Sequence, residues 1–175
     1  EFEAAEQQGQ KYDYNVWPYP LESPLHGPRA IKNSPWIEGN ADASPYGWHD
    51  VNGDTDPEYD ITRGNNVWAQ DDEDGNNDDK GYSPKASDFV FDYAYNPEAK
   101  VPIDNIDAAL TNLFYWNNLI HDIAYHYGFT EEAGNFQQNN YDKGGEGNDF
   151  VFADAMDGST PYNANFYTPK DGEAP

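Results

Sequence analysis

The chain of 175 residues carries 33 acidic and 9 basic side chains, which gives it a formal net charge of −24. This charge disfavours partners rich in phosphate, so nucleic acids and anionic membrane surfaces are excluded as electrostatic ligands. The apolar runs are far shorter than the roughly 20 residues that cross a bilayer, and no signal segment opens the chain. We therefore expect a soluble chain that is processed or truncated.

Aromatic residues are the main source of apolar surface in this sequence. Aliphatic residues are scarce and the charge is high, a combination that alone is typical of disorder. Against it stand 5 Trp and 14 Tyr, and each buried ring can remove about 150–250 Å² from water. We expect a folded domain with an aromatic core. The chain has 0 Cys, so the compartment must be inferred from acidity, which fits an extracellular protein bathed in calcium or a protein from a salty medium.

The N-terminal half is predicted to be rich in loops. Residues 1–10 are polar and lack an apolar period, which predicts a flexible leader before a single domain over residues 11–175. Pro, Gly, Asn and Asp recur every few residues over 11–81, leaving short β-prone pieces at 14–17 and 59–62. The alternation of Phe89, Phe91 and Tyr93 with smaller or polar residues predicts a strand over 87–95.

One long amphipathic helix is predicted over residues 106–127. Asp104 is suited to the N-cap, Asp107 favours the first turn, and Gly128 can take the left-handed conformation that ends a helix. Residues at intervals of three and four form an apolar stripe that includes one amide. They are Ile106, Leu110, Leu113, Asn117, Ile120, Ala124 and Tyr127. Strands are predicted at 150–153 and 164–167. The fold class is therefore α+β, a loop-rich β part with one long helix.

The histidines do not form a helical zinc pair. His121 and His126 are five residues apart, which places them about 140° apart around a helix, whereas a pair that shares one zinc needs a spacing of four. We interpret His121 and Asp122 as structural groups that hydrogen-bond to their surroundings, and Asn117 as a buried amide that joins the helix to a loop. No catalytic residue is assigned in this chain.

Two acidic loops are candidate calcium sites, since several carboxylate and amide oxygens alternate with turn residues and can close on a hard cation. Neither loop completes an EF-hand, and a solvated acidic turn is the alternative interpretation of each. The candidates are Asp50, Asn52, Asp54, Asp56 and Glu58 in the first loop, and Asp72, Asp74, Asn76 and Asp78 in the second.

Several segments in order resemble the catalytic domain of fungalysin-type metallopeptidases. The similar segments are residues 12–20 (YDYNVWPYP), 44–50 (SPYGWHD), 62–67 (TRGNNV), 113–122 (LFYWNNLIHD), 127–137, 144–149 and 163–166. The resemblance runs from about Tyr12 to Pro175, although Thr160 and Tyr162 depart from the Gly and Asn expected in their loop.

The resemblance implies part of a secreted zinc endopeptidase of thermolysin-like architecture, made with an inhibitory propeptide. The family's zinc ligands, a His-Glu-x-x-His helix and a downstream Glu, are not in this sequence, so they are expected in a C-terminal remainder beyond Pro175. The chain would then be the N-terminal part of the catalytic domain, with peptides or proteins as substrates. The resemblance places Asn163, Ala164 and Asn165 against the substrate, on an edge strand over 163–167. The alternative is an extracellular binding module without catalysis, stabilised by calcium.

Overall fold

In the residues that the structure describes, the secondary structure consists of one long helix, five short strands and three short 3-10 helices. The computed structural model describes residues 12–37, 41–54, 56–159 and 164–175, so the predicted leader over 1–10 lies outside the described residues. The regular elements are β1 (Asp13–Val16), β2 (Ala30–Asn33), β3 (Val67–Asp71), β4 (Val90–Phe91), α1 (Ile106–His126) and β5 (Val151–Ala155), with short 3-10 helices η1 (Pro35–Ile37), η2 (Pro102–Asn105) and η3 (Glu131–Ala133). The fold is mixed α and β with one long helix, which confirms the coarse prediction.

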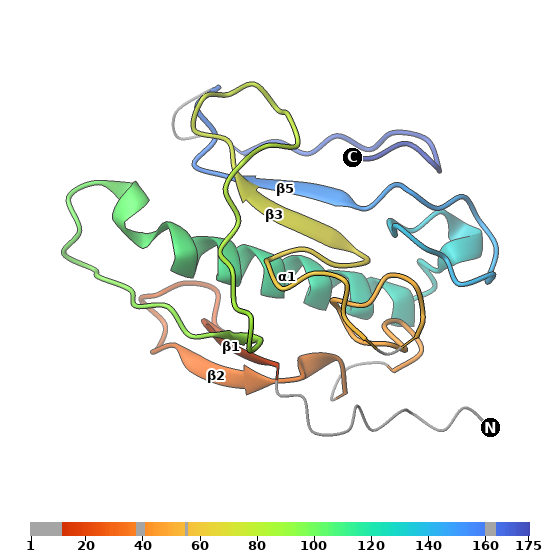
Figure 1. The fold of residues 1–175 in the computed structure, drawn as a ribbon, viewed down its shortest axis with the longest axis horizontal. Helices are drawn as coiled ribbons and strands as arrows, with labels where there is room; N and C mark the ends of the chain where they lie inside the picture. The colour runs from red at the N-terminus through yellow and green to blue at the C-terminus, as the bar shows by residue number, and fades with distance from the viewer. Residues whose placement is uncertain (1–11, 38–40, 55, 160–163) are drawn as a thin grey trace.

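Two small sheets lie on opposite sides of α1 (Figure 1). In the first sheet β1 is central, antiparallel to β2 and parallel to β4. The second sheet is the parallel pair of β3 and β5, in which Val67 is opposite Val151. Because α1 contacts β1, β3 and β5, the helix is the element that joins the two sheets.

The strand predictions were partly right. The pieces predicted at 14–17 and 150–153 form as β1 and β5, each shifted by one or two residues, whereas 59–62 contributes only an isolated bridge between Ile61 and Lys85. In the segment 87–95 only β4 is paired. Beyond it, the Arg29 guanidinium donates to the carbonyl oxygen of Tyr93 at 2.7 Å, so a side chain takes an acceptor that a neighbouring strand would use.

The strand predicted at 164–167 was wrong for the residues described. No regular structure is assigned there, and the side chains of residues 164–167 are exposed. The alternation of Asn and aromatic residues gave the prediction, but a strand also needs a partner to pair with, and no described segment pairs with this one.

The helix begins at the predicted residue and ends one residue before the predicted end, but its N-cap differs from the predicted one. Gly128 follows α1 with a φ of 100°, as expected for the residue that ends a helix. Asp104 is not the N-cap, because Pro102 starts the 3-10 turn η2 and Asp104 lies within it. Asn105 precedes α1, and its side chain bonds instead to the backbone nitrogen and oxygen of Asn96, at 2.7 and 2.9 Å.

The buried face of α1 differs from the predicted stripe. Ile120 and Tyr127 are 58% and 85% exposed. Asn117 is half-buried and donates to the Leu113 carbonyl within its own helix, so the buried amide that reaches a loop is its neighbour Asn118. The fully buried positions of the helix are Ala108, Leu110, Thr111, Phe114, Tyr115, Asn118 and Asp122. Three of these are polar, which is why an apolar pattern missed them.

Aromatic rings fill the core, as the composition predicted. Tyr14 stacks on Phe91 with 5.4 Å between ring centroids, and His49 stacks on Phe91 and Phe114 at 5.4 and 4.9 Å. The buried aromatic residues of the cluster are Tyr12, Tyr14, Trp36, Trp48, Phe89, Phe91, Phe114 and Tyr115. In the part of the chain that the structure describes, no helix has the length and apolar character needed to span a bilayer.

Candidate metal and substrate sites

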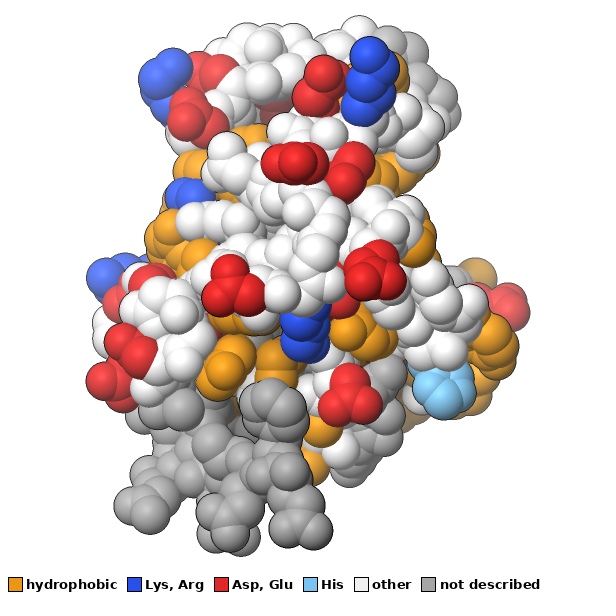
Figure 2. Space-filling model, turned by 90° about the vertical axis from the view of Figure 1, so that its right-hand side faces the viewer, with side chains coloured by type: hydrophobic (Ala, Val, Ile, Leu, Met, Phe, Trp, Pro, Cys, Tyr) orange, Lys and Arg blue, Asp and Glu red, His pale blue; other side chains and the backbone are white. Residues whose placement is uncertain are grey.

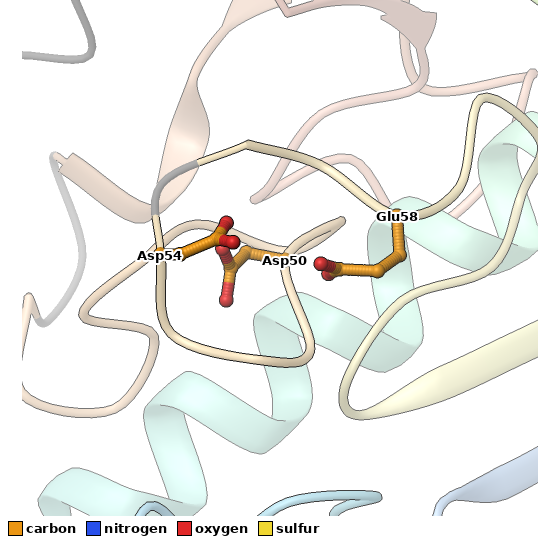
Figure 3. Close-up of side chains that lie close together, drawn as sticks. All are labelled: Asp50, Asp54 and Glu58. Atoms are coloured by element: carbon orange, nitrogen blue, oxygen red, sulfur yellow. The ribbon is translucent and has the colours of Figure 1, made fainter.

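Three carboxylates of the first acidic loop converge on one point. One oxygen atom from each of Asp50, Asp54 and Glu58 lies within 4.8 Å of the others, and Figure 3 shows the three side chains around the same loop. Asp50 is buried, whereas Asp54 and Glu58 are exposed. Like charges at this separation repel one another, and a hard cation bound by oxygen ligands would relieve that repulsion.

Backbone N–H groups hold these carboxylates in place. Gly53, with a φ of 84°, donates to Asp50 Oδ1 at 2.7 Å, and Val51 donates to Glu58 Oε2 at 2.6 Å. Asn52 accepts from the backbone of Asp54 at 2.8 Å, which uses its side-chain oxygen to close the turn. The structure therefore brings Asp50, Asp54 and Glu58 together, while Asn52 shapes the loop.

Tyr141 packs under the buried member of this group. Its hydroxyl donates to the carbonyl oxygen of Asp50 at 3.1 Å. Burial, followed by the charges of Asp50 and Glu58, raises the pKa of the Tyr141 hydroxyl, so it remains a donor. Asp56 stays exposed and donates its backbone N–H to Asp54 Oδ1 at 3.1 Å.

The second acidic loop uses many of its oxygens internally. The two carboxylate oxygens of Asp72 accept from the backbone N–H groups of Asn76 and Asn77, and Asn76 accepts from the backbone of Asp78. Asp74 accepts from the Asn76 amide at 2.7 Å, and Asp78 pairs with Lys80 at 2.6 Å. Among the described residues, the carboxylates of this loop do not meet in a group of three as those of the first loop do.

The substrate candidates lie in an exposed segment. Asn163 is outside the described residues, whereas Ala164 and Asn165 are exposed. The next residue, Phe166, packs edge-on against Phe136 at 6.2 Å between centroids, which anchors the segment to the body of the protein. Within the described chain, no backbone hydrogen bond uses the N–H or C=O groups of residues 164–167.

The residues described do not fit a zinc site. His49 is buried, donates from Nδ1 to the Arg63 carbonyl and accepts at Nε2 from the Tyr14 hydroxyl. Both ring nitrogens of His121 lie 3.0 Å from side-chain oxygens of Asp122 and Gln137, as the structural interpretation of this histidine predicted. In the part of the chain with described placement, the only cluster with ligand geometry contains no histidine.

A buried polar network joins α1 to the loop before β3, which confirms Asp122 as a structural hydrogen-bonding group, whereas Asn118 was missed by the sequence analysis. Asp122 accepts from the Ser44 hydroxyl at 2.7 Å and from the Trp48 indole at 3.0 Å, and Asn118 accepts from Asn66 at 3.1 Å. The spacing of Asn118 and Asp122 could have predicted this network, because residues four apart lie on the same side of a helix.

The chain matches known proteins over nearly all of its length. A profile of the family described as fungalysin metallopeptidase (M36) matches residues 13–175. Extracellular metalloproteinase 2 of Trichophyton tonsurans is 45% identical over 162 residues, which cover 92% of this chain and 25% of the relative. Extracellular metalloproteinase 1 of Arthroderma gypseum is 46% identical over 161 residues, covering 91% and 24%. The chain thus spans about a quarter of the length of the curated relatives it matches.

Proposed function

Because the chain belongs to the fungalysin metallopeptidase family, we propose that it is the N-terminal part of the catalytic domain of a secreted zinc endopeptidase. The observation that carries this proposal is the family match over residues 13–175, together with relatives that are named extracellular metalloproteinases. The longer protein would hydrolyse peptide bonds outside the cell. The same relatives favour this function over the non-catalytic binding module.

In this proposal the zinc ligands and the general base belong to the C-terminal remainder of the enzyme. The described histidines support that division, since His49 and His121 already use both ring nitrogens. Zinc would polarise the scissile carbonyl and activate a water molecule. The present chain would supply scaffold and one wall of the cleft in a thermolysin-like architecture, with an inhibitory propeptide as a further partner before activation.

We assign substrate contact to Asn163, Ala164 and Asn165. The exposure of Ala164 and Asn165, and the free backbone groups of residues 164–167 within the described chain, support this assignment. An extended peptide is held largely through its main chain, so a segment with unpaired N–H and C=O groups can bind it. The Asn side chains would hold groups that flank the scissile bond.

We also assign a stabilising calcium ion to the first acidic loop. The convergence of Asp50, Asp54 and Glu58 within 4.8 Å supports it. Asn52 and Asp56 lie in the same loop and would shape it around the ion. Calcium at the second loop, with Asp72, Asp74, Asn76 and Asp78, is the weaker proposal, because among the described residues no three carboxylates of that loop converge as those of the first loop do.

The test is hydrolysis of casein by the complete protein that contains this segment. We expect activity that a zinc chelator abolishes and added zinc restores, and no activity or tight zinc binding by the 175-residue chain alone. The matched control is the complete protein in which the Glu of the His-Glu-x-x-His helix is replaced by Gln. Hydrolysis that survives in this control, or chelator-sensitive hydrolysis by the 175-residue chain alone, would contradict the proposal.

A further inference from the structure

Helix α1 carries a second apolar stripe, on the side opposite the one buried in the core. A helix turns about 100° per residue, so this stripe is centred about 180° from the middle of the buried face. We call it the outer stripe, and it consists of Ala109, Leu113, Trp116, Ile120, Ile123 and Tyr127.

The two halves of the outer stripe differ in what covers them. In the first half, Leu113 and Trp116 are half-buried and pack against the edge of the core cluster, and the Trp116 indole donates to the Trp17 carbonyl at 3.0 Å. Leu113 and Trp116 line an apolar groove together with Trp17 and Tyr95. In the second half, side chains are open to solvent: Ile120 is 58% exposed, Ile123 42% and Tyr127 85%.

This composition is unusual for the solvent face of a helix. A surface helix normally sets polar residues opposite its buried side, and a helix that is apolar on both sides is typically enclosed by other elements. No member of the outer stripe is charged or polar apart from the tips of Trp116 and Tyr127. The outer stripe therefore has the composition of an interface.

The exposed apolar surface continues past the end of the helix. Phe129 bonds through its backbone N–H to the Ala124 carbonyl, and its ring lies 5.6 Å from that of Phe136. Phe136 in turn contacts Phe166, which is 61% exposed and adjoins the assigned substrate segment. Figure 2, which views the molecule from the side on which α1 ends, shows apolar side chains between scattered acidic ones.

The net charge of the chain limits which molecules can cover the outer stripe. Two copies of this chain would each bring a net charge of −24, and an anionic lipid surface would meet the same repulsion. The relatives are about four times as long as the matched segment, so a fungalysin-family protein contains much chain that this one does not.

We propose that the outer stripe of α1 is the surface on which the C-terminal remainder of the fungalysin catalytic domain packs. The inference rests on the proposed function, since it takes the chain as one part of a longer peptidase. Helix α1, which has the two small sheets on opposite sides, then packs against the zinc-bearing part through its outer stripe. The groove beside Trp116 receives an apolar side chain of that part.

Hydroxyl-radical footprinting of the complete, monomeric protein tests the inference. Tyr127 is compared with Tyr19, which is 64% exposed and lies outside the outer stripe. We expect Tyr127 to be protected several-fold relative to Tyr19, with Ile120 and Ile123 protected as well. Labelling of Tyr127 as fast as Tyr19 would overturn the inference, as would protection that disappears when a dimer is diluted to monomer, because a second copy would then be the occupant.

A pair of matched variants gives a second readout. In the complete protein, Ile120→Asp is expected to lower the Tm by roughly 5 °C or more because it places a charge in the interface, whereas Ile37→Asp, at a side chain that is 71% exposed, leaves the Tm nearly unchanged. Equal Tm values for the two variants would contradict the inference, and if Ile120→Asp does not fold, footprinting of the wild type decides. If the complete protein does not hydrolyse casein but Tyr127 is protected from labelling, the proposed function is wrong and the proposed interface still holds.

Discussion

The indole Nε1 of Trp48 donates a 3.0 Å hydrogen bond to Oδ2 of Asp122, across 74 positions of sequence. Trp48 is 0% exposed and Asp122 2% exposed, so the bond lies inside the protein. Asp122 also accepts from the Ser44 hydroxyl at 2.7 Å. This carboxylate therefore fastens the last turns of α1 to the loop that carries the first acidic cluster.

Removing that acceptor should destabilise the fold. Asp122→Ala leaves the Trp48 indole N–H and the Ser44 O–H buried without this acceptor, which we expect to lower the free energy of unfolding by about 3 kcal/mol. Asp122→Asn keeps one acceptor oxygen and should lose less. Urea unfolding followed by tryptophan fluorescence measures both, with the exposed Asp104→Ala as control. A loss for Asp122→Ala no larger than that for Asp104→Ala would show that the network contributes little.

Buried His49 should make stability depend on pH below neutrality. Burial lowers the pKa of His49 from 6.5 to about 4, so the unfolded chain binds the proton more readily than the folded one. The stabilisation is complete above pH 6.5 and is lost as the pH falls toward 4, by about 3 kcal/mol. His49→Gln should flatten the pH dependence of unfolding in this window, whereas His26→Gln, at an exposed site, should not. An unchanged slope in His49→Gln would assign the acid sensitivity to other groups.

Calcium should stabilise the protein through the first acidic loop. Above the dissociation constant, each tenfold rise in free calcium is expected to add about 1.4 kcal/mol to the free energy of unfolding, which appears as a rising Tm. Asp54→Ala should abolish the rise, because Asp54 belongs to the converging group. Asp74→Ala, in the second loop, is the matched control and should keep it. If millimolar calcium leaves the Tm of the wild type unchanged, both loops are solvated turns without bound calcium.

The assigned substrate segment can be tested kinetically in the complete enzyme. Asn163→Ala should reduce kcat/KM by roughly 5- to 150-fold, the effect of losing about one hydrogen bond worth 1–3 kcal/mol in the transition state. Zinc content and Tm should not change. Asn33→Ala, at an exposed position on β2, provides the control. Equal kinetics for the two variants would remove Asn163 from the substrate site.

The aromatic core and the long helix were predictable because both depend on local composition and period. The partner of each strand was not. β3 was missed because it lies in a stretch full of turn residues, and the strand expected at 164–167 has no described neighbour to pair with. An alternation of apolar and polar residues shows which side of a strand faces the core. Whether the strand forms depends on a partner strand that can be distant in the sequence.

The sequence predicted which loop holds the candidate metal site, but not which residues of that loop form it. Alternating oxygens marked the loop from Asp50 to Glu58, yet only the fold shows that Asp50, Asp54 and Glu58 converge. The second loop has the same pattern, and its side chains also accept from their own backbone, but among the described residues no three of its carboxylates converge. Spacing cannot separate these outcomes, because each depends on which N–H groups the local turns leave free.

The parallel pairing of β3 with β5 has a consequence for how the protein folds. Gln70 and Asp154 face each other in this pair although they are 84 positions apart. Bringing residues this far apart in sequence into contact costs the entropy of closing a long loop before the contact adds any stability. Folding that depends on such contacts is therefore slow. During synthesis β3 emerges long before β5 and stays unpaired in the interval, when its open edge can pair with another chain. We therefore expect a nascent chain that stops before Val151 to aggregate more readily than one that reaches Ala155.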